Sequence, residues 1–202
     1  MKKLKDFFIA YTVGAPRLRR AGFTMVELLV VIGITVVIAT MSLSAYPNFA
    51  RTTDFQNVLL DVALTLREAQ VFGLGTREAD AGGVDAFDVA YGVRFSVNDA
   101  TLIFFIDRND DGIYNGSLSG ESFREFVLRP SFTINRLCVE PACFTPVDTL
   151  DITFKRPNPN ARVTIDGGGT FILFPEARIE MRSPQGDLKS ILVLPTGQIS
   201  LE

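Results

Sequence analysis

The chain has 202 residues, of which 47% are hydrophobic and 21% are charged, and it contains no histidine. This length suits one domain with a core and an appendage, and this composition excludes an intrinsically disordered chain and a polytopic membrane protein. Without histidine, the chain lacks the commonest general base and the commonest metal ligand.

Charge is divided unevenly along the chain. Residues 1–22 contain six basic residues and one acidic residue, which gives them a net charge of +5, and the total of −3 therefore leaves −8 for residues 23–202. Because non-specific nucleic-acid binding needs a basic surface, we expect no nucleic-acid partner for this acidic body. The basic start is expected to stay in the cytoplasm.

The first predicted element is an apolar helix at residues 23–46, which contains a single formal charge, Glu27. At about 1.5 Å per residue, roughly twenty such residues cross the ~30 Å hydrocarbon core of a bilayer. The positive-inside rule then predicts a single-pass protein in the cytoplasmic (inner) membrane, with the chain after Tyr46 outside the cytoplasm.

Two ordinary interpretations of this apolar run are less favoured. A secretory signal peptide has an apolar region of about 7–15 residues and a small-x-small cleavage site, whereas this run is longer and Pro47 directly follows its small residues. An ordinary membrane anchor does not favour a carboxylate near the start of its span, because burying one costs up to ~3 kcal/mol at mid-span. Glu27 is therefore expected to have a partner.

The segment from Arg19 to Ile32 reads RRAGFTMVELLVVI. It resembles the class III signal of type IV prepilins and type II secretion pseudopilins, in which a basic leader ends in Gly and Phe-Thr-x-x-Glu opens an apolar helix. The resemblance implies cleavage by prepilin peptidase between Gly22 and Phe23, followed by N-methylation of Phe23. It also implies assembly with other pilin or pseudopilin subunits into an extracytoplasmic filament.

Glu27 corresponds to the family's fifth mature residue and is the expected assembly residue. After cleavage, the free amine of Phe23 is largely cationic at neutral pH. An ion pair between this amine and Glu27 of a neighbouring subunit would remove two lone charges from hydrocarbon and set the axial register of the helices. The alternative is that the Glu27 side chain merely extends to the lipid headgroups.

The helix is predicted to continue outside the membrane over residues 47–75. Pro47 is expected to kink it or to end it for a turn. Apolar residues then recur at helical spacing, and polar residues occupy much of the opposite face. The apolar positions are Phe55, Val58, Leu59, Val62, Leu66 and Ala69, and the polar positions are Arg51, Asp54, Asn57, Asp61, Thr65 and Glu68. Gly73 and Gly75 are the predicted stop.

Residues 76–202 are predicted to form a β-rich head, because the hydrophobic period changes to two after Gly82-Gly83. We expect strands near 90–97, 101–106, 122–128, 131–138, 150–155, 161–165, 170–174, 177–182, 188–194 and 197–201. Short connections favour an antiparallel meander. The fold class is thus α+β, with a leader at 1–22, a membrane or filament-core helix at 23–46, an amphipathic helix at 47–75 and the head.

Cys138 and Cys143 are the only cysteines, and four residues separate them. The predicted topology places both outside the cytoplasm, where disulfides persist. We therefore predict a Cys138–Cys143 disulfide, which contributes roughly 2 kcal/mol in the chain-entropy model. Two unpaired core cysteines are the alternative.

Residues 107–112 read DRNDDG and have the oxygen spacing of a calcium loop at Asp107, Asn109 and Asp111, with glycine sixth. Ile113 offers a carbonyl and Asn115 a side chain. The twelfth position holds Leu118 in place of glutamate, which leaves Glu121 as a more distant carboxylate. A hairpin turn rich in Asp, Asn and Gly is the alternative interpretation, and the sequence otherwise indicates no cofactor.

The favoured function is that of a structural subunit, a minor pilin-like component of a type IV pilus-like filament, and not an enzyme. The sequence contains no Gly-x-Ser-x-Gly motif and no recognisable nucleophile–base pair. A pseudopilin of a type II secretion system is the first alternative. A membrane-anchored calcium- or ligand-binding module is the second, and a DNA receptor ranks last because the C-terminus lacks an arginine cluster.

Overall fold

The computed structural model describes residues 22–75, 88–140, 147–168 and 174–202, with the backbone alone for residues 44–48. The chain divides into two compact units, Met1–Asn48 and Phe49–Glu202. Each unit is described by itself below.

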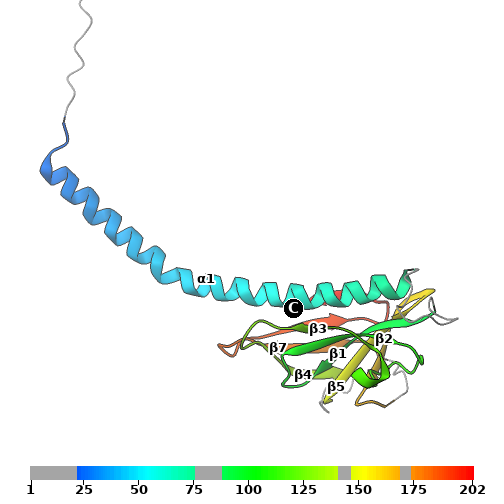
Figure 1. Cartoon of the computed structure of the whole chain (residues 1–202). Coiled ribbons are helices and arrows are strands. Elements are labelled where there is room, and N and C mark those ends of the chain that lie inside the picture. The colour runs from blue at the N-terminus through cyan, green and yellow to red at the C-terminus, as the bar shows by residue number, and fades with distance from the viewer. Residues whose placement is uncertain (1–21, 76–87, 141–146, 169–173) are drawn as a thin grey trace, which may run out of the picture. The chain divides into compact units, whose positions relative to one another are not determined.

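Helix α1 (Met25–Leu74) is the first element and contributes to both units (Figure 1). It is assigned as helix through Pro47 without a break, so the prediction that Pro47 ends the helix for a turn is wrong. Proline removes one N–H from the hydrogen-bond ladder, and the long helical segments on both sides keep the backbone helical. The predicted kink concerns how the two units are placed and stays a prediction.

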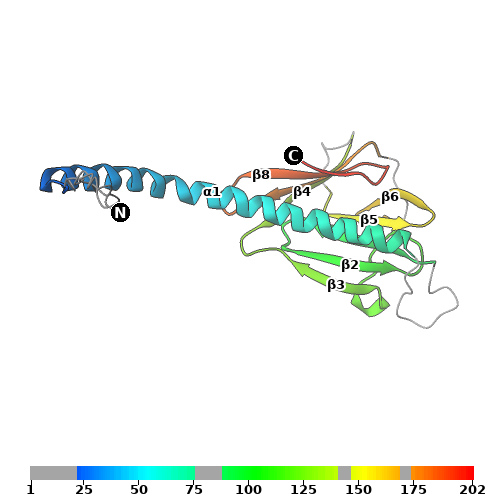
Figure 2. The same cartoon turned by 90° about the horizontal axis from the view of Figure 1, so that it is seen from above.

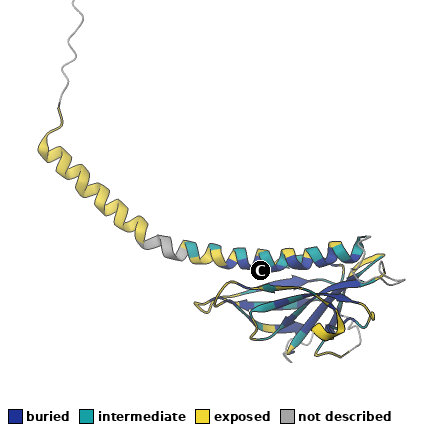
Figure 3. Ribbon diagram, in the orientation of Figure 1, coloured by how far each residue is buried: buried dark blue, intermediate teal, exposed yellow. Residues whose placement is uncertain are grey.

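The predicted apolar face of the second half of α1 is confirmed. Its six residues, Phe55 to Ala69, are all at most 2% exposed, and Figure 3 shows them as a buried stripe along the helix side that faces the strands. Thr65, which was predicted on the polar face, is buried at 5% exposure, and its hydroxyl donates to the Asp61 carbonyl at 2.9 Å. This back-bond satisfies the hydroxyl within the helix, which is why a polar residue is tolerated there.

In the described part of the chain, nine strands follow α1 and form two antiparallel sheets. The five-stranded sheet has the order β3-β2-β1-β5-β6, and the four-stranded sheet has the order β4-β7-β8-β9. The strands are β1 (Ala90–Ser96), β2 (Thr101–Asp107), β3 (Ser122–Val127), β4 (Thr133–Val139), β5 (Thr149–Lys155), β6 (Asn158–Ile165), β7 (Ala177–Arg182), β8 (Leu188–Val193) and β9 (Ile199–Leu201). A short 3-10 helix, η1 (Ser117–Ser119), lies between β2 and β3.

The predicted single meander is wrong, because the strands divide into two sheets and do not all pair in chain order. Strand β1 pairs with β5 as well as with β2, and β4 joins the second sheet beside β7. The hydrophobic alternation of these strands identifies them as strands but does not identify their partners. Among the described strands, the predicted consecutive antiparallel pairing holds within β1-β2-β3, within β5-β6 and within β7-β8-β9. The predicted strand at 170–174 lies outside the described residues except for Phe174, which is not in a strand.

The core lies between the second half of α1 and the two sheets. Figure 2 shows this half running above the head, with β4 and β8 on one side and β2 and β3 on the other. Aromatic side chains fill much of the space, and Phe72 of α1 contacts Tyr91, Phe104 and Phe123 with ring centroids 5.6–6.1 Å apart. The α+β class, with an antiparallel β head packed on a long helix, is confirmed.

Gly73 brings the end of α1 close to the first sheet. A Cβ atom at this position would lie 2.2 Å from the carbonyl oxygen of Phe154 in β5. The Gly73 carbonyl also accepts a hydrogen bond from the Arg156 backbone N–H at 3.0 Å. The helix ends one residue later at Leu74, so the predicted stop at Gly73 and Gly75 is confirmed.

Candidate processing and assembly site

The predicted cleavage point lies just before the first turn of α1. Gly22 and Phe23 are not helical, and both are exposed, with Phe23 at 83%. No heavy atom lies within 4 Å of a Cβ built on Gly22. A non-helical, accessible backbone at this junction is what a peptidase requires of its substrate.

Thr24 caps the helix that follows. Its hydroxyl oxygen accepts a hydrogen bond from the Glu27 backbone N–H at 3.1 Å, and its carbonyl accepts one from Leu28 at 3.1 Å. Thr24 and Glu27 therefore occupy the N-cap and N3 positions, which is the spacing of a Thr-x-x-Glu capping box, and the observed bond is the one from the Glu27 backbone to the Thr24 hydroxyl. We did not predict this cap, although the spacing in the sequence is its usual signal.

Glu27 is consequently in the first turn of α1, where the helix dipole favours a negative charge. The residue is exposed. A local role in the cap and a role toward another chain are compatible, because the cap observed here uses the backbone N–H of Glu27 and leaves its carboxylate accessible.

The first half of α1 is apolar on all sides. The segment Met25–Leu43 has 19 residues with a mean hydropathy of 2.4, and none of it is buried in the structure. Its hydroxyl groups bond back to the helix: Thr35 donates to the Ile32 carbonyl, Thr40 to the Val37 carbonyl and Ser42 to the Ile38 carbonyl. By length and composition this segment is able to cross a membrane.

The second half of α1 also carries apolar side chains on its outer face. Leu60, Leu64 and Val71 are 48%, 64% and 59% exposed. Leu60 borders two shallow surface pockets, both of which Leu201 of β9 also lines. This apolar ridge, defined here as Leu60, Leu64, Val71 and Leu201, lies on the surface of the head unit and is uncovered in the isolated chain.

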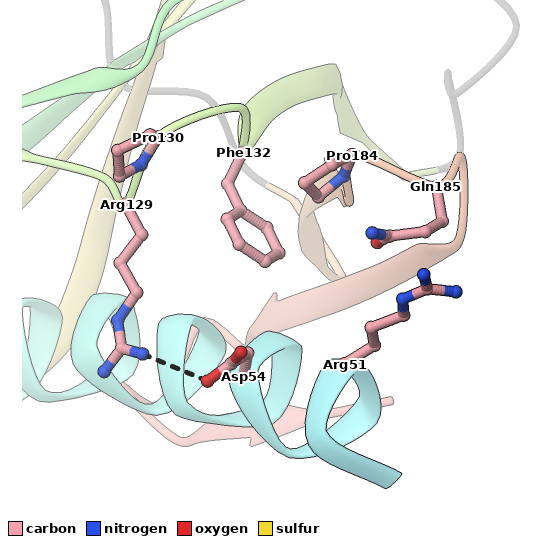
Figure 4. A pocket seen from close by; sticks show the side chains of 7 residues that line it. All are labelled: Arg51, Asp54, Arg129, Pro130, Phe132, Pro184 and Gln185. Carbon is pink, nitrogen blue, oxygen red and sulfur yellow. Dashed lines mark hydrogen bonds and ion pairs between the residues drawn. The ribbon is translucent and has the colours of Figure 1, made fainter. Parts of the chain in front are cut away.

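A third pocket lies where the β3–β4 connection meets α1 (Figure 4). Phe132 lines it and packs on Phe55 with ring centroids 5.5 Å apart. Arg129 reaches across to Asp54 of the helix, with an Nη1–Oδ1 distance of 3.3 Å. Both members of this ion pair are about half exposed, so it contributes at most about 1 kcal/mol. The pocket is therefore part of the contact between a loop and the helix.

The acidic loop that follows β2 is drawn together by its own side chains. Asp107 Oδ2 accepts a hydrogen bond from the Gly112 backbone N–H at 2.9 Å. Asp111 Oδ2 accepts from the side-chain amides of Asn109 and Asn115 at 2.7 and 2.9 Å. The predicted positions 107, 109 and 111 are thus brought into one tight turn, with Gly112 at φ 75°.

Carboxylates from two other parts of the head reach the same loop. Glu121 Oε2 accepts from the Asn115 backbone N–H at 2.8 Å, and Asp151 Oδ2 accepts from that of Tyr114 at 3.4 Å. Glu121 is 2% exposed, whereas Leu118, at the twelfth loop position, is fully exposed. Glu121, which the sequence suggested as a more distant carboxylate, therefore lies against the loop. The contribution of Asp151 was not predicted, because it depends on the pairing of β5 with β1.

Asp107 is electrostatically perturbed in this setting. Its burial, together with the nearby charges of Asp111 and Asp110, raises the pKa of this carboxyl to about 6, against the lowering effect of the Gly112 hydrogen bond. Its Oδ1 atom is buried without a hydrogen-bond partner. Among the described residues, no group of three or more His, Cys, Asp or Glu side chains stands ready to hold a metal ion.

Cys138 lies in β4 and is 3% exposed. The described part of the chain contains no free cysteine. Cys143 lies outside the described residues, so the bridge between Cys138 and Cys143 stays a prediction.

Comparison with known proteins bears on the start of the chain. Residues 17–43 match the family model described as the prokaryotic N-terminal methylation motif. No curated protein and no solved structure matches the chain significantly. The matched range contains Gly22, Phe23, Thr24 and Glu27, so the chain carries a prepilin-type signal on an exposed apolar helix, an arrangement compatible with anchoring in the inner membrane before assembly.

Proposed function

We propose that this protein is a structural subunit, minor pilin-like, of a type IV pilus-like filament. Prepilin peptidase cleaves it between Gly22 and Phe23, and Phe23 is then N-methylated. The observation that carries the proposal is the methylation motif at residues 17–43, which ends within an apolar helix with no buried residue from Met25 to Leu43.

The exposed apolar surface of α1 supports assembly. In hydrocarbon the segment Met25–Leu43 is stable alone, but outside a membrane it needs other apolar surface around it. Packing against the same segment of neighbouring subunits supplies that surface. The apolar ridge of Leu60, Leu64, Val71 and Leu201 is a second surface that neighbouring heads would cover.

The position of Glu27 also supports the packing of α1 against neighbouring subunits, because its charge needs a cationic partner there. A carboxylate within a packed apolar bundle is costly unless a cation compensates it. The only new cation that processing creates is the amine of Phe23. We therefore assign Glu27 to an ion pair with the Phe23 amine of an adjacent subunit, which fixes the axial register of the helices.

A pseudopilin of a type II secretion system is the second candidate, because the same signal and the same helix serve both machines. The size of the head, about 130 residues after the helix, favours a minor subunit in either case. A monomeric membrane-anchored binding module is the third candidate, and it requires no function for Glu27.

Mass spectrometry of filaments sheared from cells, compared with the membrane fraction, tests the proposal. We expect an N-terminal peptide that begins at methylated Phe23 in the sheared filaments, at low abundance relative to the main subunit. The same peptide found only in the membrane fraction would favour the secretion pseudopilin. A chain that begins at Met1 in every fraction would contradict the proposal.

A further inference from the structure

We propose that the loop between β2 and η1 binds one calcium ion through side-chain oxygens of Asp107, Asn109 and Asp111 and the backbone carbonyl of Ile113, with Glu121 as an additional carboxylate. This site belongs to the folded head and requires neither processing nor assembly. It is therefore independent of the function proposed above.

The buried oxygen of Asp107 is the first observation that points to a ligand. Asp107 is 1% exposed, and its Oδ1 has no hydrogen-bond partner. Its other oxygen accepts from Gly112, so the carboxyl group is directed into the loop. An unsatisfied carboxylate oxygen in a buried position is unfavourable, and a bound cation satisfies it directly.

The charge balance around the loop is the second observation. Two of its carboxylates already have cationic partners: Asp110 pairs with Lys155 at 2.9 Å and Arg162 at 2.6 Å, and Asp151 pairs with Arg94. The other three carboxylates around the loop are Asp107, Asp111 and Glu121. None of them takes part in an ion pair among the described residues. A divalent cation would offset most of that excess negative charge.

Neutral oxygen donors complete the proposed site. The side-chain amide of Asn115 lies 2.9 Å from Asp111 Oδ2 and 3.5 Å from the Ile113 carbonyl oxygen, and that of Asn109 lies 2.7 Å from Asp111 Oδ2. A half-turn of an asparagine amide exchanges its nitrogen for its oxygen without moving the backbone. In the structure, Asp111 Oδ2 accepts hydrogen bonds from both amides. Calcium binding therefore requires the Asp111 carboxylate to rotate away from these amides and toward the ion.

The donor set selects calcium over magnesium. Calcium accepts six to eight oxygens at 2.3–2.6 Å in flexible geometry, whereas magnesium needs a near-ideal octahedron and keeps its water. A loop that mixes carboxylate, amide and carbonyl oxygens, and that takes its last carboxylate from Glu121 beyond the usual twelfth position, suits the larger ion. Extracellular calcium modules bind with dissociation constants of about 10⁻⁴–10⁻³ M, which is the range we expect.

Isothermal titration of the full chain in detergent micelles with CaCl₂, and separately with MgCl₂, tests the site. We expect one calcium ion per chain, binding of magnesium at least about tenfold weaker, and a higher thermal unfolding midpoint with calcium than with EDTA. Asp107→Asn removes the charge of the buried ligand but retains its shape, and we expect it to weaken calcium binding about tenfold or more. Asp111→Asn should also weaken calcium binding, and this variant tests the site if Asp107→Asn does not fold.

Asp110→Asn is the matched control, because it removes the same charge from the same loop at a residue that pairs with Lys155 and Arg162. We expect it to change calcium affinity less than about threefold, well short of the tenfold loss of a ligand. Equal weakening by all three substitutions would indicate diffuse attraction of cations and overturn the site. So would the absence of saturable binding up to about 10 mM calcium, tenfold above the weakest affinity of such modules, or equal affinity for magnesium.

Discussion

Thr24 caps α1 and Glu27 lies in its first turn, and the two side chains have different roles. The Thr24 hydroxyl accepts the Glu27 backbone N–H, which is a local contribution to the helix of about 1 kcal/mol. The Glu27 carboxylate is exposed and free to meet another chain. The cap depends on Thr24, whereas the proposed ion pair depends on the charge of Glu27.

The substitution Glu27→Gln distinguishes these two roles. Glutamine retains the size of the side chain and its place in a capping box, but it lacks the negative charge. We expect normal cleavage and membrane insertion, and a reduction in filament incorporation of about tenfold or more, because breaking a buried ion pair costs about 3–5 kcal/mol. Immunoblotting of sheared filaments and membranes measures both steps.

Thr24→Ala is the control for this experiment, since it weakens the cap and leaves the carboxylate in place. We expect incorporation of Thr24→Ala to stay closer to that of the unchanged protein than incorporation of Glu27→Gln does. Normal incorporation of Glu27→Gln would rule out the ion pair and leave Glu27 with its local role.

The first half of helix α1 is exposed and its second half packs on the two sheets, and its sequence changes accordingly. The first half is apolar on every side, whereas the second has one buried face from Phe55 to Ala69. Gly73 ends this second half against β5. The close approach to Phe154 requires a residue without a Cβ atom, so the end of the helix is positioned by packing as well as by the helix stop.

We therefore predict that Gly73→Ala destabilises the head, although alanine favours a helix more than glycine does. Its Cβ would lie 2.2 Å from the Phe154 carbonyl oxygen, and relieving such a clash costs about 1–3 kcal/mol. Thermal unfolding of the purified full chain, followed by circular dichroism, should show a lower midpoint. Gly33→Ala is the matched control, because no atom lies within 4 Å of its Cβ position; an equal loss of stability in both variants would contradict the packing argument.

At the scale of the whole molecule, the described residues include two uncovered apolar surfaces: the segment Met25–Leu43 and the ridge of Leu60, Leu64, Val71 and Leu201. The first surface lies on α1 and the second on α1 and β9, and the two belong to different compact units. If the protein is a filament subunit, both surfaces are buried only after assembly. A substitution on the ridge should then affect assembly without affecting the isolated chain.

Leu64→Arg tests this expectation. Leu64 is 64% exposed, so we expect a change in the free energy of unfolding within about 0.5 kcal/mol, together with a several-fold loss of incorporation into sheared filaments. Val127→Arg is the matched control, since Val127 is 67% exposed on β3 and lies off the ridge. Equal incorporation of the two variants would exclude the ridge as a subunit contact.

The processing signal was predicted from its resemblance to the prepilin signal, whereas local chemistry in the chain was sufficient to predict the two halves of α1 and most of the strands. These features depend on residues a few positions apart: Gly22 next to Phe23, apolar side chains every three or four residues, and alternation along each strand. The end of the helix at Leu74 followed from the same local patterns. Thr24 as a cap was within reach of the same reasoning, because Thr-x-x-Glu is a local signal.

Three features could be seen only in the folded chain. They are the pairing of β1 with β5, the place of β4 in the second sheet and the continuation of α1 through Pro47. Strand partners depend on contacts between segments far apart in sequence, and alternation is the same whichever partner a strand takes. The acidic loop illustrates the difference. Its spacing was visible in DRNDDG, but the burial of Asp107 and the arrival of Glu121 and Asp151 follow from how β2, β3 and β5 pack around it.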